Sequence, residues 1–159
     1  MKTILSDPAS NRQYPFLVYG TLRPGCGNYR GFLMGRTESE ETVQVNGFRM
    51  YGRTAFPYLV ATGGEDDVVT CTLIKVPGSL YGQVLRELDS LEGFYTVGST
   101  LNHYDRKLAT FTVNGFLTCA WVYVASADVA REVVKEMPLI LSGDWLQHKA
   151  ETDLRYSFS

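Results

Sequence analysis

The sequence predicts an α+β fold in which a mixed β-barrel or sheet is flanked by α-helices. Three observations support this class: strand-like segments dominate the first half of the chain, they do not alternate regularly with helical segments, and a strong hairpin signal follows the first long helix. Regular alternation would instead favour a doubly wound parallel sheet. The 159 residues, of which 45% are hydrophobic, suit one domain over residues 1–159, with a loose polar leader over 1–13.

The first half of the chain is expected to form mainly strands. Its segments are rich in β-branched and aromatic residues and are bounded by turn-forming residues. Asn46-Gly47 is a turn signal inside the segment Val43–Tyr51. Pro57 places the segment Phe56–Val60 at a sheet edge, because proline cannot donate to a strand ladder. The expected strands are Phe16–Tyr19, Val43–Tyr51, Phe56–Val60 and Val68–Val76.

The second half combines helices with a hairpin. A helix is expected from a cap at Ser79 through Glu92, ended by Gly93 at the usual C-terminal position. Asn114-Gly115, the strongest two-residue hairpin signal, joins the next two strands, and a second helix follows before Pro138. These segments are Lys107–Val113, Phe116–Val124 and the helix Asp128–Met137 with Ser126 as its cap; Trp145 is expected to anchor the tail by packing.

Composition excludes several function classes. The net charge is −2 with no block of like charge, which does not favour nucleic acid or an acidic membrane surface as a partner. No segment is long and apolar enough to span a bilayer, and no signal peptide is evident. Three cysteines without a CxxC pair indicate reduced thiols and a cytoplasmic protein. Three scattered cysteines and only two histidines also do not favour a zinc site.

The first candidate site is the loop after the first strand. The apolar run ends in Tyr19-Gly20-Thr21-Leu22, with Gly25 and Asn28 just beyond, which predicts a strand running into a tight loop with unpaired backbone amides. Such amides can hold a carboxylate by their N–H groups alone, because no side chain stands in the way at glycine. Most strand–turn sequences bind nothing, so this signal needs a second one. Cys26 lies in the same loop, but no histidine is tied to it as an activating base.

The second candidate is a carboxylate on the apolar side of a helix. Glu92 lies seven residues after Leu85 and four after Leu88, which places it on the side that packs inward. Partial desolvation and the negative end of the helix dipole both raise the pKa of a carboxyl group there. A group of this kind can exchange protons near neutral pH. The structural alternative is that Glu92 reaches water or pairs with Arg106.

Three motifs in a fixed order resemble a known family. The Tyr19–Leu22 loop is followed by Leu88-Asp89-Ser90-Leu91-Glu92-Gly93-Phe94 and then by Tyr104-Asp105-Arg106. From Phe16 to Val124 this order and spacing are similar to the gamma-glutamylcyclotransferase-like family, which includes the gamma-glutamylamine cyclotransferases. The resemblance implies a mixed barrel-like sheet flanked by helices, with a cavity at its mouth. The tail after Ala125 adds no motif.

The resemblance also implies a reaction and a site. Family members release pyroglutamate (5-oxoproline) from a gamma-glutamyl compound without a metal or an organic cofactor. By motif, Tyr19 and the backbone amides of Gly20, Thr21 and Leu22 bind the substrate and its α-carboxylate. Glu92 is the general acid/base. Tyr104 lines the pocket, although Thr96–His103 resembles an insertion that places it further along the chain.

This chemistry suits the residues. The free α-amine of a gamma-glutamyl group can attack its own γ-carbonyl, so the enzyme needs a substrate held in an attacking conformer and one carboxylate to move protons. Two alternatives remain: a fold relative that binds a small carboxylated metabolite without turnover, and a structural or partner-binding domain. The second predicts a barrel mouth filled by side chains. Neither the leaving amine nor the oligomeric state follows from the sequence.

Overall fold

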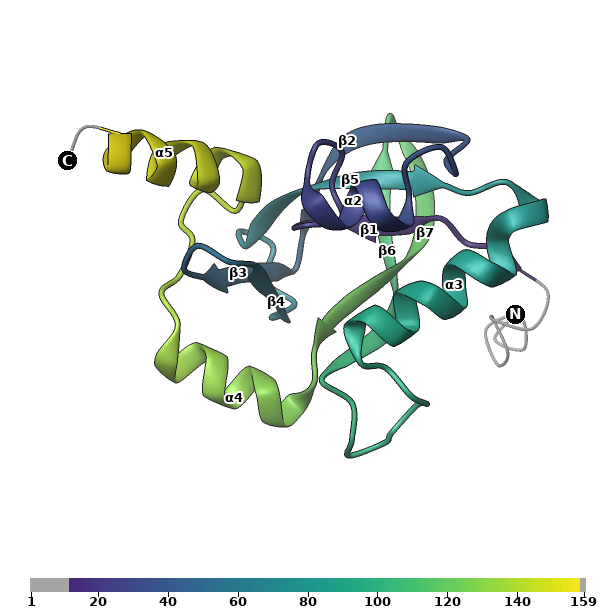
Figure 1. Cartoon of the computed structure of the whole chain (residues 1–159). Coiled ribbons are helices and arrows are strands. Elements are labelled where there is room, and N and C mark those ends of the chain that lie inside the picture. Colours follow the sequence, from purple (N-terminus) through teal and green to yellow (C-terminus); the bar gives the residue numbers. More distant parts are fainter. Residues whose placement is uncertain (1–11, 158–159) are drawn as a thin grey trace.

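The computed structural model describes residues 12–157, and its main sheet is mixed (Figure 1). The strand order is β2-β5-β1-β7-β6. β1 pairs antiparallel with β5 but parallel with β7, and the other neighbours are antiparallel. The fold class is therefore confirmed as α+β with a mixed sheet. The strands are β1 (Phe16–Val18), β2 (Ser39–Asn46), β5 (Val68–Lys75), β6 (Tyr104–Val113) and β7 (Phe116–Ala125).

A separate two-stranded sheet contains the expected edge strand. It consists of β3 (Phe48–Gly52) and β4 (Pro57–Ala61). Pro57 is the first residue of β4, one of the few strand positions that proline tolerates. Asn46-Gly47 divides the expected Val43–Tyr51 segment between the two sheets, and Gly47 adopts a positive φ of 96° at the break.

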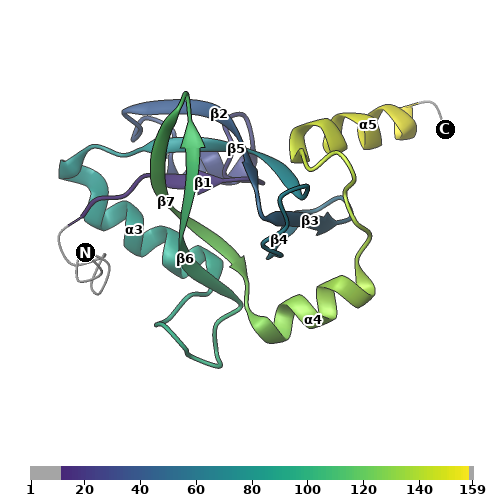
Figure 2. The same ribbon diagram turned by 180° about the vertical axis from the view of Figure 1, so that it is seen from behind.

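Within residues 12–157, four helices lie around the sheets: α2 (Gly27–Phe32), α3 (Gly78–Glu92), α4 (Ala127–Glu136) and α5 (Trp145–Ser157). Seen from both sides, α3 packs at one end of the molecule, whereas α4 and α5 lie toward the β3–β4 end (Figures 1 and 2). No helix within residues 12–157 has the length and hydropathy needed to cross a membrane.

Two hydrophobic clusters form the core, and β1 belongs to both. Phe16 and Val18 pack with Val84 and Leu88 of α3. Leu17 packs in the second cluster, with residues of β3, β4 and the tail. Because successive strand residues point to opposite faces, one three-residue strand contributes to both clusters. Trp145 is 1% exposed in the second cluster, which confirms it as a packing anchor.

The strongest local signals are confirmed. Val113 pairs with Phe116 across the hairpin, and Asn114 and Gly115 both have positive φ angles, as a two-residue primed turn requires. Gly93 caps α3 in the left-handed conformation, with φ 69°. Ser126 precedes α4 as expected, although its side chain makes no capping hydrogen bond.

Other expectations are corrected. Ser79 is not the cap of α3, because the helix already starts at Gly78 with Pro77 in the cap position. β6 begins at Tyr104, three residues before Lys107, because Tyr104 to Arg106 continue the ladder with β7. The short helix α2 and the terminal helix α5 were not expected. Of the expected leader, residues 1–11 lie outside the described part of the chain.

Candidate active site

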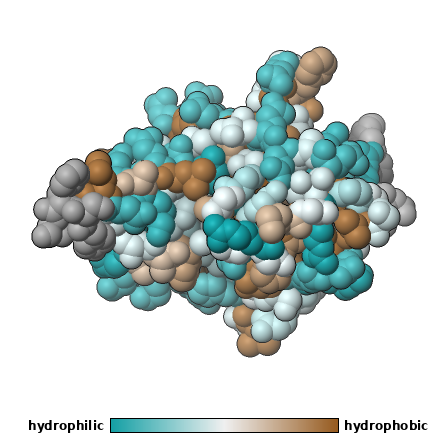
Figure 3. All heavy atoms as spheres, turned by 45° about the horizontal axis from the view of Figure 1, so that its top comes forward, coloured by the Kyte–Doolittle hydropathy of each residue, from teal (hydrophilic) through white to brown (hydrophobic). Residues whose placement is uncertain are grey.

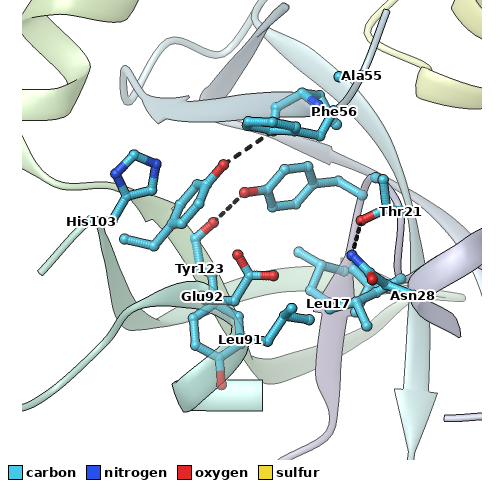
Figure 4. A pocket seen from close by; sticks show the side chains of 15 residues that line it. Leu17, Thr21, Asn28, Ala55, Phe56, Leu91, Glu92, His103 and Tyr123 are labelled. Carbon is cyan, nitrogen blue, oxygen red and sulfur yellow. Dashed lines mark hydrogen bonds between the residues drawn. The ribbon is translucent and has the colours of Figure 1, made fainter. Parts of the chain in front are cut away.

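A cavity of about 370 Å³ opens where β1, α3, β4 and β6 meet. In Figure 4, Thr21 and Asn28 lie on one side, His103 on the other, and the Glu92 carboxyl group projects between them. The structure brings the six sequence-predicted site residues into its lining: Tyr19, Gly20, Thr21, Leu22, Glu92 and Tyr104. Sequence reasoning missed the contributions of Pro57, His103 and Tyr123, which no local motif indicates.

The loop after β1 has free amides at the cavity. Two of its carbonyl groups are engaged: Gly20 O accepts from the Arg23 amide at 2.9 Å and Thr21 O from the Tyr29 amide at 3.1 Å. The N–H groups of Gly20, Thr21 and Leu22 have no hydrogen-bond acceptor among residues 12–157. Successive unpaired amides lining a cavity form a potential anion site.

Asn28 orients the Thr21 hydroxyl of the loop. Its side-chain Nδ2 donates to Thr21 Oγ1 at 2.7 Å, and both residues line the cavity (Figure 4). Because Thr21 Oγ1 accepts this bond, its own hydrogen remains available to a ligand. The short helix α2, which carries Asn28 and was not expected, therefore supports the loop.

Arg23 anchors the loop from outside the cavity lining. It is 4% exposed, and its guanidinium donates to Thr72 of β5 at 3.1 Å and to Asp144 Oδ1 at 2.9 Å. Asp144 also accepts from the Leu146 amide at 3.1 Å, at the start of α5. The tail thus helps to hold the loop, although no motif in the tail indicates this role.

Glu92 ends α3 and is half-buried in the cavity wall. Burial raises the pKa of its carboxyl group to about 7. The alternative of a pair with Arg106 is wrong, because Arg106 Nε instead donates to Asp89 Oδ1 at 2.8 Å. Among the described residues, no lysine, arginine or histidine forms a salt bridge with Glu92. Within the described part of the chain, no salt bridge therefore offsets the effect of burial on the pKa of Glu92.

Tyrosine hydroxyls near Glu92 are held as donors. Tyr19 OH donates to the Tyr123 carbonyl at 2.6 Å, and Tyr104 OH donates to the Pro57 carbonyl at 3.3 Å. Burial raises the pKa of both tyrosines, and the nearby Glu92 charge raises it further. These hydroxyls stay protonated at neutral pH and form a fixed polar wall.

The cysteines are not part of this cavity. Cys26 precedes α2 and does not line the pocket, and burial raises the pKa of its thiol. This placement is contrary to a nucleophilic role for Cys26, since an activated cysteine needs a lowered pKa. Within residues 12–157, no three His, Cys, Asp or Glu side chains are grouped as metal ligands would be.

Comparisons with known proteins identify the family and the fold. Residues 16–147 match the family described as "Gamma-glutamyl cyclotransferase, AIG2-like". No curated protein sequence matches. A solved AIG2-like protein (ggact) from Mus musculus is 25% identical, with a TM-score of 0.56 over 79% of this chain and 84% of that one.

Two further solved structures show the same fold. The protein ytfP from Escherichia coli is 23% identical, with a TM-score of 0.52 over 83% of this chain and 96% of that one. The uncharacterized protein PH0828 from Pyrococcus horikoshii is 18% identical, with a TM-score of 0.54 over 91% of this chain and 97% of that one.

Proposed function

Because this chain belongs to the gamma-glutamyl cyclotransferase, AIG2-like family, we propose that it releases 5-oxoproline from a gamma-glutamyl amine or amide, with Glu92 as general acid/base. The observation that carries the proposal is one cavity that joins the free amides of Gly20, Thr21 and Leu22 to a carboxyl group whose pKa is about 7. Family membership indicates cyclotransferase-type chemistry on a small molecule; the substrate and the residue roles belong to this proposal.

In the binding step, the loop holds the α-carboxylate of the gamma-glutamyl group. The unpaired amides of Gly20, Thr21 and Leu22 donate to the carboxylate, and the Thr21 hydroxyl adds a further donor. Fixing one end of the substrate favours the conformer in which its α-amine lies against its γ-carbonyl. Since both reacting groups belong to one molecule, this positioning supplies much of the rate enhancement.

In the chemical step, Glu92 moves protons. Its carboxylate removes a proton from the α-ammonium group, and the freed amine attacks the γ-carbonyl carbon to close a five-membered lactam. As the bond from that carbon to the departing nitrogen breaks, Glu92 returns the proton to the leaving amine. The ring nitrogen, which carries two hydrogens after the attack, releases one of them to solvent, so that the lactam is neutral. The carboxyl group thus ends the cycle as it began, and the products are 5-oxoproline and a free amine. Tyr19 and Tyr104 form the polar wall of the reaction site.

The direct test is a panel of gamma-glutamyl amines and amides assayed by mass spectrometry for 5-oxoproline. We expect time-dependent 5-oxoproline from at least one class of leaving amine. A panel member that binds without being turned over, with no product from any other, would identify a non-catalytic binder. The cavity is contrary to the filled barrel mouth expected of a purely structural domain.

The pH dependence of turnover should report Glu92. Because its pKa is about 7 and the base must be deprotonated to accept a proton, we expect kcat/KM to fall by about tenfold per pH unit below this value. Steady-state kinetics between about pH 5 and 9 measure this limb. Activity that stays constant down to pH 5 would contradict the assignment of a high-pKa base.

Thr21→Val should separate binding from chemistry. The substitution preserves the shape of the side chain but removes the hydroxyl that Asn28 orients. We expect KM to rise by about 5- to 10-fold with kcat little changed, because one hydrogen bond to the bound carboxylate is lost. Thr21→Ser, which keeps the hydroxyl, serves as the control. Equal KM values for both variants would exclude this donor.

A further inference from the structure

A partly buried charge pair lies beside the last turn of α3, outside the proposed chemistry. Asp89 Oδ1 accepts a hydrogen bond from Arg106 Nε at 2.8 Å and another from the Tyr123 hydroxyl at 2.6 Å. The side chains of Asp89 and Arg106 are only 21% and 12% exposed. The guanidinium also lies over the rings of Phe94 and Trp121, at 5.0 and 4.3 Å. These contacts fix both charges in place.

The pair is connected to both parts of the candidate site. Asp89 precedes Glu92 by three residues on α3, so the two side chains are neighbours on one helix. Tyr123, which donates to Asp89, lines the cavity (Figure 4), and its carbonyl accepts from Tyr19 at 2.6 Å. Tyr123 therefore connects the helix that carries Glu92 to the strand end that leads into the binding loop.

The charge of the pair matters because, within residues 12–157, the cavity lining offers Glu92 no carboxylate, lysine or arginine as a neighbour. The remaining titratable groups in the cavity lining with Glu92 are Tyr19, Tyr104, Tyr123 and His103. A lone carboxylate at Asp89 would oppose ionisation of Glu92, and a lone cation at Arg106 would favour it. The two charges of the pair have opposite signs, so their effects on Glu92 oppose each other. Burial alone is the cause of the raised pKa of Glu92.

We propose that Asp89 and Arg106 act together as positioning residues: a neutral pair that holds Tyr123 against the cavity and cancels its own field at Glu92. The pair does not touch the reacting atoms. The effect of the pair on the ionisation of Glu92 is a property of the protein without substrate. Only the benefit of this effect to catalysis rests on the proposed function.

The test measures the Glu92 carboxyl titration directly, by NMR of protein with ¹³C-labelled glutamate side chains and without substrate. The Glu92 signal is assigned by its loss in Glu92→Gln. In Asp89→Asn, which keeps an oxygen for Tyr123, the remaining Arg106 cation should lower the pKa of Glu92 by on the order of one unit. Arg106→Gln leaves the Asp89 anion and should raise this pKa by a similar amount.

Two control variants separate charge from shape. Arg106→Lys keeps the cation, and Asp89→Asn combined with Arg106→Gln removes both charges. In each, the pKa of Glu92 should stay within about 0.3 unit of the parent value. Single-charge variants that shift this pKa in the same direction, or leave it unchanged, would overturn the proposal. If those variants do not fold, a shift of more than about half a unit in either control overturns it instead.

Kinetics then distinguish this inference from the proposed function. If Glu92 is the base, the acidic limb of kcat/KM should move with the NMR titration in every folded variant. Opposite NMR shifts in the single variants, in a protein that turns over no gamma-glutamyl compound, would support the charge pair and reject the cyclotransferase. Turnover of a gamma-glutamyl compound, with no shift of the Glu92 pKa in the single variants, would reject the charge pair and support the cyclotransferase.

Discussion

Glu92→Gln is expected to lower kcat by about 10²- to 10⁴-fold, the usual contribution of a general acid/base. The amide fills the same volume but cannot accept the proton from the α-ammonium group or return it to the leaving amine. KM should change little, because in the proposed mechanism the loop, and not Glu92, holds the carboxylate of the substrate. 5-Oxoproline release by mass spectrometry measures the loss. Near-normal turnover in this variant would mean that another group is the base.

The same substitution should stabilise the protein above neutral pH. Burial raises the pKa of Glu92 from 4.5 to about 7, so the folded state binds a proton that the unfolded state releases between these values. Parent stability therefore falls as pH rises through this window, and the ionised group costs up to about 3 kcal/mol above it. Chemical denaturation should show Glu92→Gln more stable than the parent at pH 8, with the difference vanishing near pH 4.

Glu87→Gln provides the matched control for both measurements. Glu87 lies on the same helix but pairs with Arg36 at 2.7 Å, and this hydrogen bond lowers its pKa. The substitution should leave turnover unchanged and, in contrast to Glu92→Gln, should not stabilise the protein at pH 8. A gain in stability for both variants would indicate a general effect of removing acidic charge from α3.

Gly20→Ala is expected to weaken binding of 5-oxoproline by about tenfold or more, equivalent to about 1.4 kcal/mol. A Cβ at this position would lie 2.7 Å from both Cγ and Cδ of Pro57, a contact that forces the loop or β4 to shift. Either shift disturbs the cavity, because Gly20 and Pro57 both line it and the Pro57 carbonyl accepts from Tyr104. A larger Gly20→Val substitution should have a stronger effect.

Titration calorimetry with 5-oxoproline measures this loss, and Gly31→Ala is its control. A Cβ at Gly31 meets nothing within 4 Å, and the residue lies in α2. Alanine there should leave binding unchanged and stabilise the helix by up to about 1 kcal/mol. Undiminished binding in Gly20→Ala would exclude the backbone loop as the carboxylate site.

The structure changes the physical explanation for the requirement at Gly20. The sequence suggests that glycine is needed because a side chain would block the approaching carboxylate. In the structure the missing Cβ makes room for Pro57, which arrives from the other sheet. A strand–turn motif records that a small residue is needed, but it contains no information about which distant segment packs against it.

Residues that are close in the sequence determined the hairpin turn, the end of α3, the side of the helix on which Glu92 lies and the loop after β1. Asn114-Gly115 specifies its turn because both residues tolerate positive φ, and Gly93 ends α3 for the same reason. The helical period placed Glu92 on the inward side of α3, and the Tyr19–Leu22 loop follows from an apolar strand ending in glycine. These features depend on neighbours within a few residues.

Tertiary structure alone decided what surrounds those features. It brought Tyr104 and Tyr123 into one cavity with Glu92 and paired Arg106 with Asp89 rather than with Glu92. It also fixed the Tyr19–Leu22 loop, through Arg23, to the start of α5. These partners are far apart in the chain. Their pairing follows from strand order and burial, which short sequence motifs do not specify. The sequence therefore determined a tight loop after β1 and an inward-facing carboxylate, whereas packing decided that they share one cavity.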